Sequence, residues 1–139
     1  MRALKQFAAV AAVAASVALM AAPAHAAERD SVCNTGEVCL WADWNWTGAM
    51  LDTNYSTKYL GSVTMNDGYS ANDRASSTKN YDNANTVYFY EHEGYAGGKM
   101  AEGPGSIRQN LASNSFSSGA GANDNIGSFC FSSNSGCPR

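Results

Sequence analysis

The chain has 139 residues, with 9 basic and 12 acidic side chains and a formal net charge of −3. That length predicts a single domain with a modest core. The acidic balance argues against a nucleic-acid partner, which would need a basic patch.

Residues 1–26 have the order of a secretory signal peptide. Arg2 and Lys5 give a positive start, the stretch 7–22 is almost wholly apolar or small, and a small-x-small cleavage pattern ends at Ala26. The apolar run is short for a membrane span. We therefore expect a secreted, extracellular chain that starts at Ala27. Removal of the signal peptide takes away two basic residues, which lowers the basic count from 9 to 7 against 12 acidic residues. We expect no contact with the membrane after this cleavage.

The expected mature chain contains four cysteines: Cys33, Cys39, Cys130 and Cys137. An even count in a short exported chain predicts two disulfides, for which three pairings exist. The pairs Cys33–Cys39 and Cys130–Cys137 are favoured because each is close in the chain, whereas the alternative joins the two ends of the domain. Zinc competes for such cysteines, but only one histidine, His92, remains after the signal.

Short segments with strand composition follow the first cysteine pair. Strands are expected at Leu40–Trp41 and, more weakly, over residues 50–60, with a loop over residues 61–71. The best strand is Thr86–Tyr90, which is β-branched and aromatic, and Phe129–Phe131 closes the chain. No segment after the signal shows helical periodicity. Many short strands with glycine-rich turns predict an all-β sandwich.

Two patterns occur twice, in the same order. The first is an aromatic, four residues, an aromatic, one residue and a glycine, found at Trp41, Trp46 and Gly48 and again, 49 residues later, at Tyr90, Tyr95 and Gly97. The second is a polar stretch, Asn72–Ser77, which Asn123–Ser128 echoes 51 residues later. Two such units at nearly equal spacing indicate an internal repeat.

The repeated unit has a physical logic. Glycine permits a backbone angle that is closed to other residues, so the aromatic hairpin can fold over. A later serine, Ser77 or Ser128, can then hydrogen-bond into the folded hairpin. Four strands with a long return connection form a Greek key, and two keys packed face to face form a small sandwich.

At these residues the chain resembles the βγ-crystallin family, over most of the mature part. The resemblance implies an all-β, double Greek-key βγ-crystallin-like sandwich as the single domain 27–139. Greek key one would span about residues 36–80 and Greek key two about residues 86–131.

The polar stretches are similar to that family's calcium motif, which has Asn or Asp twice, two further residues, Ser or Thr, and Ser. Asn72–Ser77 matches at every position, whereas Gly127 stands where the second copy should have a hydroxyl. Asn, Asp and Ser supply the oxygen ligands that calcium takes. The competing interpretation is a pair of polar turns.

The resemblance implies calcium as a cofactor in two shared sites. In the first, Asp73 and Ser76 would be side-chain ligands and Arg74 would lend a carbonyl, completed near Glu91–Glu93. In the second, Asp124 would be completed near Asp43. The remaining members of the two stretches complete the candidate set: Asn72, Asn123 and Asn125.

The start of the domain carries a second resemblance. This segment is similar to the bacterial peptidase inhibitor family thirty-six, of the metalloproteinase-inhibitor type. The residues that carry the similarity are Cys33, Glu37–Trp41, Asp43 and the Trp46-x-Gly48 pattern. The specific part is the cysteine pair immediately before the first aromatic hairpin. This resemblance implies local disulfides and a secreted protease as partner.

An inhibitor needs a rigid loop, and disulfide-closed loops are rigid, which lowers the cost of binding. The loops 33–39 and 130–137 both qualify. The second begins with Cys130 and Phe131, and a bulky apolar side chain such as Phe131 suits a protease specificity pocket. The competing interpretation is that this loop only fastens the C-terminus. The loop 103–122 is a third candidate.

An alternative function is an extracellular calcium-binding structural module, or a carbohydrate or cell-wall binding module that uses exposed aromatics such as Trp44. An enzyme is the weakest interpretation. His92 is the only histidine after the signal, and no Gly-x-Ser-x-Gly elbow occurs. We therefore expect a monomeric, non-enzymatic inhibitor.

Overall fold

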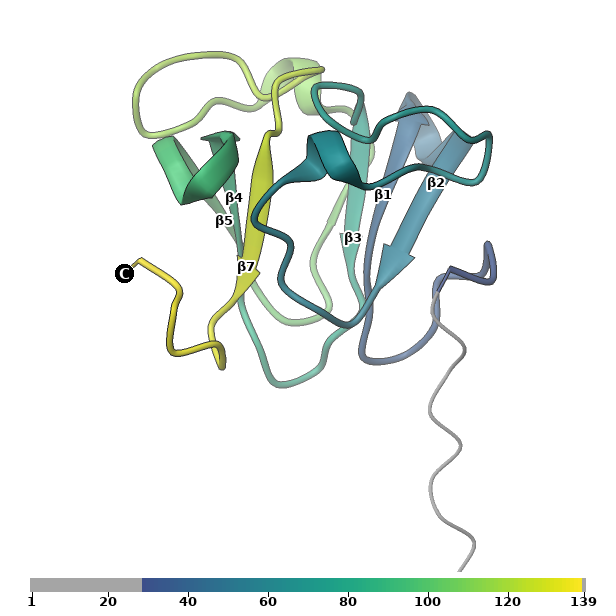
Figure 1. Cartoon of the computed structure of the whole chain (residues 1–139), viewed down its shortest axis with the longest axis horizontal. Helices are drawn as coiled ribbons and strands as arrows, with labels where there is room; N and C mark the ends of the chain where they lie inside the picture. The colour runs from purple at the N-terminus through teal and green to yellow at the C-terminus, as the bar shows by residue number, and fades with distance from the viewer. Residues whose placement is uncertain (1–28, 139) are drawn as a thin grey trace, which may run out of the picture.

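The computed structural model describes residues 29–138. The expected signal peptide, 1–26, and the expected mature start at Ala27 lie outside these residues. Within 29–138 no helix has the length and apolar character to cross a membrane. Two twisted sheets face each other across the molecule, and the C-terminal segment continues from the end of β7 (Figure 1).

The first half has five elements: β1 (Val38–Asp43), η1 (Trp44–Trp46), β2 (Thr47–Thr53), η2 (Leu60–Ser62) and β3 (Ser77–Asn80). The second half repeats the order and adds one short strand: β4 (Val87–His92), η3 (Glu93–Tyr95), β5 (Ala96–Glu102), β6 (Ile107–Arg108), η4 (Leu111–Ser113) and β7 (Ser128–Phe131). The η elements are single 3-10 turns. The expected strand over residues 50–60 ends at Thr53, because the chain there leaves the sheet.

One sheet has the order β2-β1-β3-β6 and the other β5-β4-β7, and every pair is antiparallel. The halves exchange segments. Strand β6 of the second half pairs with β3 of the first, and Thr57 of the first half bridges to Phe129 in β7. The fold class predicted from the sequence, an all-β sandwich, is therefore confirmed.

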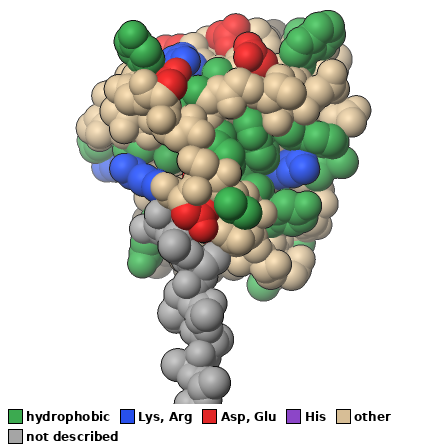
Figure 2. Space-filling model, turned by 90° about the vertical axis from the view of Figure 1, so that its right-hand side faces the viewer, with side chains coloured by type: hydrophobic (Ala, Val, Ile, Leu, Met, Phe, Trp, Pro, Cys, Tyr) green, Lys and Arg blue, Asp and Glu red, His purple; other side chains and the backbone are tan. Residues whose placement is uncertain are grey.

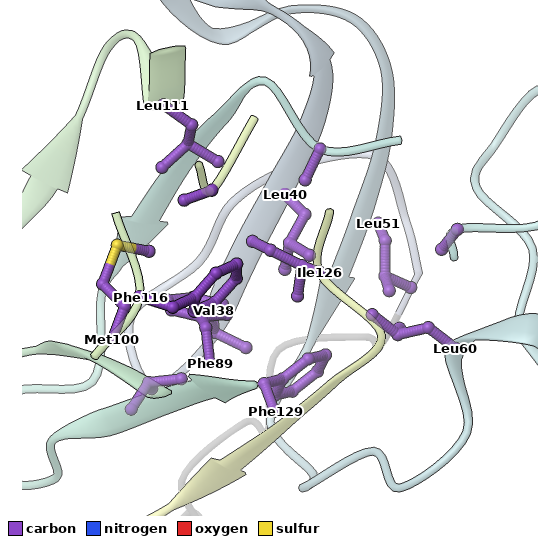
Figure 3. Packing of buried hydrophobic residues seen from close by; sticks show 14 of the residues in the cluster. Val38, Leu40, Leu51, Leu60, Phe89, Met100, Leu111, Phe116, Ile126 and Phe129 are labelled. Carbon is purple, nitrogen blue, oxygen red and sulfur yellow. The ribbon is translucent and has the colours of Figure 1, made fainter. Parts of the chain in front are cut away.

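The core lies between the two sheets (Figure 3). Alternate residues of the longer strands point into it, as the two-residue period of a strand requires. Val38 and Leu40 of β1 and Phe89 of β4 are completely buried there. Burying each such side chain stabilises the fold by roughly 1.5–3 kcal/mol. The intervening residues Cys39 and Tyr90 pack in two smaller clusters outside the main core.

The two aromatic hairpins are folded over in the same way. Gly48 and Gly97 have φ angles of 76° and 79°, in the left-handed region that favours glycine. The Ser77 hydroxyl donates to the Asp43 carbonyl at 2.6 Å and accepts from the Trp46 N–H at 3.1 Å. Ser128 makes the same two bonds, at the same distances, with His92 and Tyr95.

The side of the molecule next to β2 carries a mixed surface. Hydrophobic side chains gather in its middle, and acidic and basic groups are interspersed around them (Figure 2). Exposed large hydrophobic side chains are found in both halves: Val32, Trp44, Tyr55, Tyr59, Tyr69, Tyr81 and Ile107.

Candidate functional site

The two polar stretches cross over between the halves. The Ser76 hydroxyl donates to Asp124 Oδ1 at 3.0 Å, and the Asp124 N–H donates to the Ala75 carbonyl at 3.0 Å. The Ser76 N–H donates to the Trp41 carbonyl at 2.8 Å. These contacts bring a carboxylate of the second half, a hydroxyl of the first half and the first hairpin into one place, which we call cluster A.

A related arrangement, cluster B, surrounds Asp73. The Asp73 N–H donates to the Ile126 carbonyl at 3.1 Å, and the Gly127 N–H donates to the Tyr90 carbonyl at 3.0 Å. Gly127 occupies the position of Ser76, so cluster B lacks a hydroxyl. A Cβ atom added to Gly127 would lie 2.5 Å from the carbonyl carbon of His92, which leaves no room for a side chain.

This placement differs in one respect from the predicted ligand sets. Asp73 does lie on the side of the second hairpin, and Asp124 on the side of the first. The hydroxyl of Ser76, however, meets Asp124, although the sequence grouped it with Asp73. Both aspartates have left-handed φ angles, 53° at Asp73 and 50° at Asp124, so the two stretches share one backbone shape.

Most of the other predicted ligands make contacts through their side-chain nitrogens. Asn72 and Asn123 each donate to the neighbouring aspartate at 2.7 Å, and the Asn125 amide donates to the Gly121 carbonyl at 3.0 Å. The Arg74 guanidinium pairs with Asp67 at 2.8 Å. These contacts hold the stretches in shape.

Glu91 is tied into its own hairpin. Its carboxylate accepts from the Gly98 N–H at 3.1 Å and from the Ser118 hydroxyl at 2.9 Å. These two bonds hold the pKa of Glu91 below its ordinary value. The carboxylate therefore staples the second hairpin to the 118 loop, a role that the sequence did not indicate.

The side-chain atoms that meet in cluster A are oxygens, the ligand type of hard cations. Among residues 29–138 there is no group of three or more His, Cys, Asp or Glu side chains placed to hold a metal ion. A cation here would need hydroxyl and carbonyl oxygens, which calcium accepts at roughly 2.3–2.6 Å. Ser76 Oγ and Asp124 Oδ1, 3.0 Å apart, are close enough to share one such ion. In cluster B, Asn72 Oδ1 is buried and has no hydrogen-bond donor in the described part of the chain.

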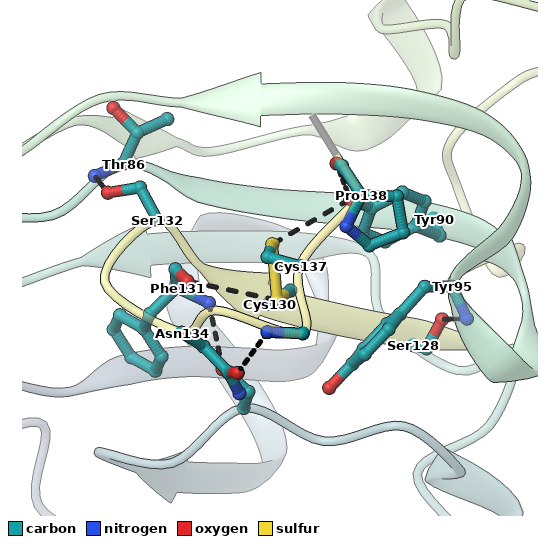
Figure 4. The surroundings of a disulfide bond; sticks show 12 residues. Thr86, Tyr90, Tyr95, Ser128, Cys130, Phe131, Ser132, Asn134, Cys137 and Pro138 are labelled. Carbon is teal, nitrogen blue, oxygen red and sulfur yellow. Dashed lines mark hydrogen bonds between the residues drawn. A yellow bond between two sulfur atoms is a disulfide. The ribbon is translucent and has the colours of Figure 1, made fainter.

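The cysteines form the local pairs that the sequence favoured. Cys33 joins Cys39, with Cα atoms 6.0 Å apart, and Cys130 joins Cys137, with Cα atoms 5.7 Å apart. Cys137 packs beside Tyr90, whose hydroxyl donates to the Pro138 carbonyl at 2.7 Å (Figure 4). The second disulfide therefore fastens the C-terminal segment to the outer face of β4 and β7.

Phe131 does not have the reactive role that the sequence suggested. It lies in β7, is 4% exposed and belongs to the main core, and Cys130 is completely buried. A side chain packed in the core cannot enter a protease pocket without unfolding the strand. The exposed part of this loop is instead the polar segment 133–136.

The first disulfide loop is a tight, well-supported turn. The Glu37 N–H donates to the Asn34 carbonyl at 3.2 Å, and the Asn34 N–H donates to Glu37 Oε2 at 2.6 Å. The Gly36 N–H donates to the Tyr81 carbonyl at 3.0 Å. Burial raises the pKa of Glu37, although the Asn34 bond lowers it in part. Thr35, at the tip of the turn, is exposed.

Sequence reasoning missed a buried carboxyl group between the sheets. Glu102 of β5 is 1% exposed, accepts from the Thr78 hydroxyl at 2.7 Å and lies 3.6 Å from Arg108 Nε. Burial raises its pKa to about 7, although Thr78 and Arg108 act in the opposite direction. Strand alternation was the available signal, because Met100 and Glu102 point to the same side.

Solved structures that this fold resembles include βγ-crystallins. A βγ-crystallin from an archaeon is 26% identical, with a TM-score of 0.52, and the match covers 70% of this chain and 99% of that one. A βγ-crystallin domain from Clostridium beijerinckii is 22% identical, with a TM-score of 0.51, covering 68% and 95%. A structure described as "Evolution of the eye lens beta-gamma-crystallin domain fold" is 22% identical, with a TM-score of 0.60, covering 73% and 90%.

Among curated proteins, no sequence matches the chain. A family description, peptidase inhibitor family I36, matches residues 26–102, which is more than half of the sequence. The matched region contains the first disulfide loop and both aromatic hairpins. The resemblance inferred from the cysteine pair before the first hairpin is thus confirmed, and the chain belongs to peptidase inhibitor family I36, on a βγ-crystallin-like fold.

Proposed function

We propose that this protein is a secreted inhibitor of metalloproteases and that it meets the protease through the disulfide loop 33–39. The observation that carries the proposal is that this loop is closed by a disulfide, supported by hydrogen bonds, exposed at Thr35 and inside the family match. A loop already fixed in one conformation loses little entropy on binding. The loop 130–137 lies outside the family match, and its one bulky candidate, Phe131, is buried.

The test is an inhibition assay with the oxidised chain that begins at Ala27. It is run against a thermolysin-like metalloprotease and against one serine, one cysteine and one aspartic protease. We expect inhibition of the metalloprotease alone. Thr35→Arg places a long charged side chain at the tip of the loop and should weaken inhibition at least tenfold, since a clash or a buried charge costs more than about 1.4 kcal/mol.

Ser133→Arg is the matched control, because Ser133 is an exposed residue in the other disulfide loop. It should inhibit like the unaltered chain. Loss of inhibition in Ser133→Arg but not in Thr35→Arg would move the contact to the second loop. Inhibition of no protease would refute the proposed activity and leave the fold assignment in place.

We further propose that cluster A binds calcium and that cluster B binds it weakly or not at all. Ser76 and Asp124 would hold the ion, together with backbone carbonyls of their neighbourhood, whereas Asp73 has only Gly127 as its counterpart. Ligand number tunes calcium affinity. An ion that binds the native state alone also raises stability.

Calorimetric titration of the chelator-treated protein with calcium tests this proposal. We expect one main binding event, which Asp124→Asn and Ser76→Ala abolish. Asp73→Asn is the comparison variant, of identical chemistry in the other cluster, and should retain the event. Loss of the event in Asp73→Asn with retention in Asp124→Asn would contradict the assignment.

A further inference from the structure

An open depression on the surface of the first half lies beside the polar stretch 72–77. Its volume is about 460 Å³, and it is lined by Tyr69, Ser70, Asn72 and Arg74. Ligand pockets commonly have volumes of roughly 300–1,000 Å³. A second cavity, beside Arg29, has a volume of about 140 Å³, which is below that range. We propose that the larger depression is a binding site for a neutral saccharide, with Tyr69 as its stacking platform.

The Tyr69 ring is exposed but held in place. It is 70% exposed, and the Arg74 guanidinium lies 5.7 Å from the ring centroid. The Tyr69 N–H donates to Asp67 Oδ1 at 3.1 Å, and the Tyr69 carbonyl accepts from the Met65 N–H at 2.9 Å. Because the backbone of Tyr69 is fixed and its ring lies against Arg74, the ring can stack on the C–H face of a sugar at a reduced ordering cost.

The charge of Arg74 is already matched. Its Nη2 atom lies 2.8 Å from Asp67 Oδ2 and its Nη1 atom 3.2 Å from Oδ1, which is the forked pairing of a guanidinium with a carboxylate. The pair therefore presents hydrogen-bonding groups for hydroxyls with little net charge for an anion. The net charge of the whole chain, −3, further disfavours acidic sugars and nucleotides.

The repeat shows that the fold does not need these side chains. Fifty-one residues after Tyr69, Ser70 and Arg74 stand Ala120, Gly121 and Asn125, so the second half has neither the ring nor the cation. The hairpin residues and their serines, by contrast, are present in both halves. Groups that only one half possesses, exposed around a depression, are available for a ligand.

The test is an NMR titration of ¹⁵N-labelled protein with two neutral probes, chitotriose and cellotriose, and one acidic probe, tri-galacturonic acid. We expect a neutral probe to bind with a Kd in roughly the millimolar range and to shift the amides of residues 67–74. Tyr69→Ala should weaken binding about tenfold, the stacking contribution of one ring, whereas Tyr69→Phe should retain it. Tyr55→Ala is the control, since Tyr55 is 65% exposed and lies outside the depression.

The proposed saccharide binding does not depend on protease inhibition or on calcium binding, and the experiments distinguish the three properties. Binding should persist in a chelator, because the lining residues do not include Ser76 or Asp124. Tyr69→Ala should still inhibit the protease. Binding that requires calcium, binding of the acidic probe alone, equal loss in Tyr55→Ala, or no shift with any probe at about ten times the expected Kd would each overturn the inference.

Discussion

The last strands of the two halves, β3 and β7, occupy the same place in the repeat and are built from opposite materials. In β3 the inward positions are Thr78 and Asn80, both completely buried. In β7, 51 residues later, the same positions hold Phe129 and Phe131, which are 0% and 4% exposed. Both strands begin with a buried serine that bonds into the hairpin of its own half.

The difference between the strands is balanced by what each one faces. Thr78 donates to Glu102 Oε2, and the Asn80 amide donates to the carbonyls of Asn85, Glu102 and Gly103 at 2.8, 3.0 and 3.0 Å. On the β7 side, Phe129 packs against Phe89 with ring centroids 6.1 Å apart. The comparison teaches that one backbone frame accepts a polar network or an aromatic cluster, because most buried polar atoms of the network have partners, although Glu102 Oε1 has no hydrogen-bond donor among the described residues.

Removing an aromatic side chain from β7 should have the largest effect on the free energy of unfolding. Phe129→Ala removes a completely buried ring from between the sheets and should lower the free energy of unfolding by about 3–5 kcal/mol. Urea unfolding followed by near-ultraviolet circular dichroism measures it. Tyr55→Ala, at an exposed ring, should change stability by less than about 0.5 kcal/mol. A loss below about 1 kcal/mol for Phe129→Ala would show that the ring does not support the core.

The stability of the polar network around Glu102 should depend on pH. The folded-state pKa of Glu102 is raised by burial to about 7 from 4.5, so the native state holds this proton more tightly than the unfolded chain. The stability that the proton provides is complete below pH 4.5 and is lost as the pH rises through 7. The loss is roughly 3 kcal/mol, since each pKa unit corresponds to about 1.4 kcal/mol.

Glu102→Gln isolates this contribution, because glutamine keeps the shape and stays neutral. The difference in unfolding free energy between the unaltered protein and Glu102→Gln should change between pH 4.5 and 7.5. Subtraction also removes the contributions of Glu37 and Asp52, whose raised pKa values act in the same direction. A difference that is flat over this range would mean that the Arg108 charge compensates fully for burial.

The repeat unit could be predicted from the sequence because its determinants are local in the chain. Gly48, Gly97 and their aromatic partners have fixed spacing, and one serine per half completes the hairpin. The inward direction of the Phe131 side chain could also be predicted. Neighbouring residues of a strand point to opposite faces, and the disulfide of Cys130 lies on the outer face. The Ser76–Asp124 contact was not, because residues 48 positions apart meet only through the exchange of segments between halves. Glu102 was missed because buried glutamates are rare and its partner Thr78 is 24 residues away.

Cluster B sharpens the comparison at a single residue. Gly127→Ser restores the missing hydroxyl of the second polar stretch, yet the new Cβ would lie 2.5 Å from the His92 carbonyl carbon. Overpacking of this kind should cost roughly 1–3 kcal/mol and create no second calcium event. Thermal unfolding and calorimetry measure the two effects. Ser76→Gly, the reverse exchange, should lower the free energy of unfolding by less than Gly127→Ser does and should remove the calcium event at cluster A. A larger loss of stability for Ser76→Gly would mean that the two halves are more alike than their contacts indicate.

The smallest loss of stability should come from removing the hairpin serine that each half contains. Ser77→Ala and Ser128→Ala each remove a buried hydroxyl that makes two hydrogen bonds, at 2.6 and 3.1 Å in both halves. Each should lower the free energy of unfolding by about 1–2 kcal/mol, and the two losses should agree within about 0.5 kcal/mol. Equality is expected because the hydroxyl bonds the hairpin backbone, whose geometry does not depend on whether Thr78 or Phe129 follows. Urea unfolding of both variants, with the exposed Ser133→Ala as control, measures the pair. Unequal losses would mean that the polar or aromatic strand behind each serine alters its hydrogen bonds, so that the hairpin and the core could no longer be treated as separate parts of the repeat.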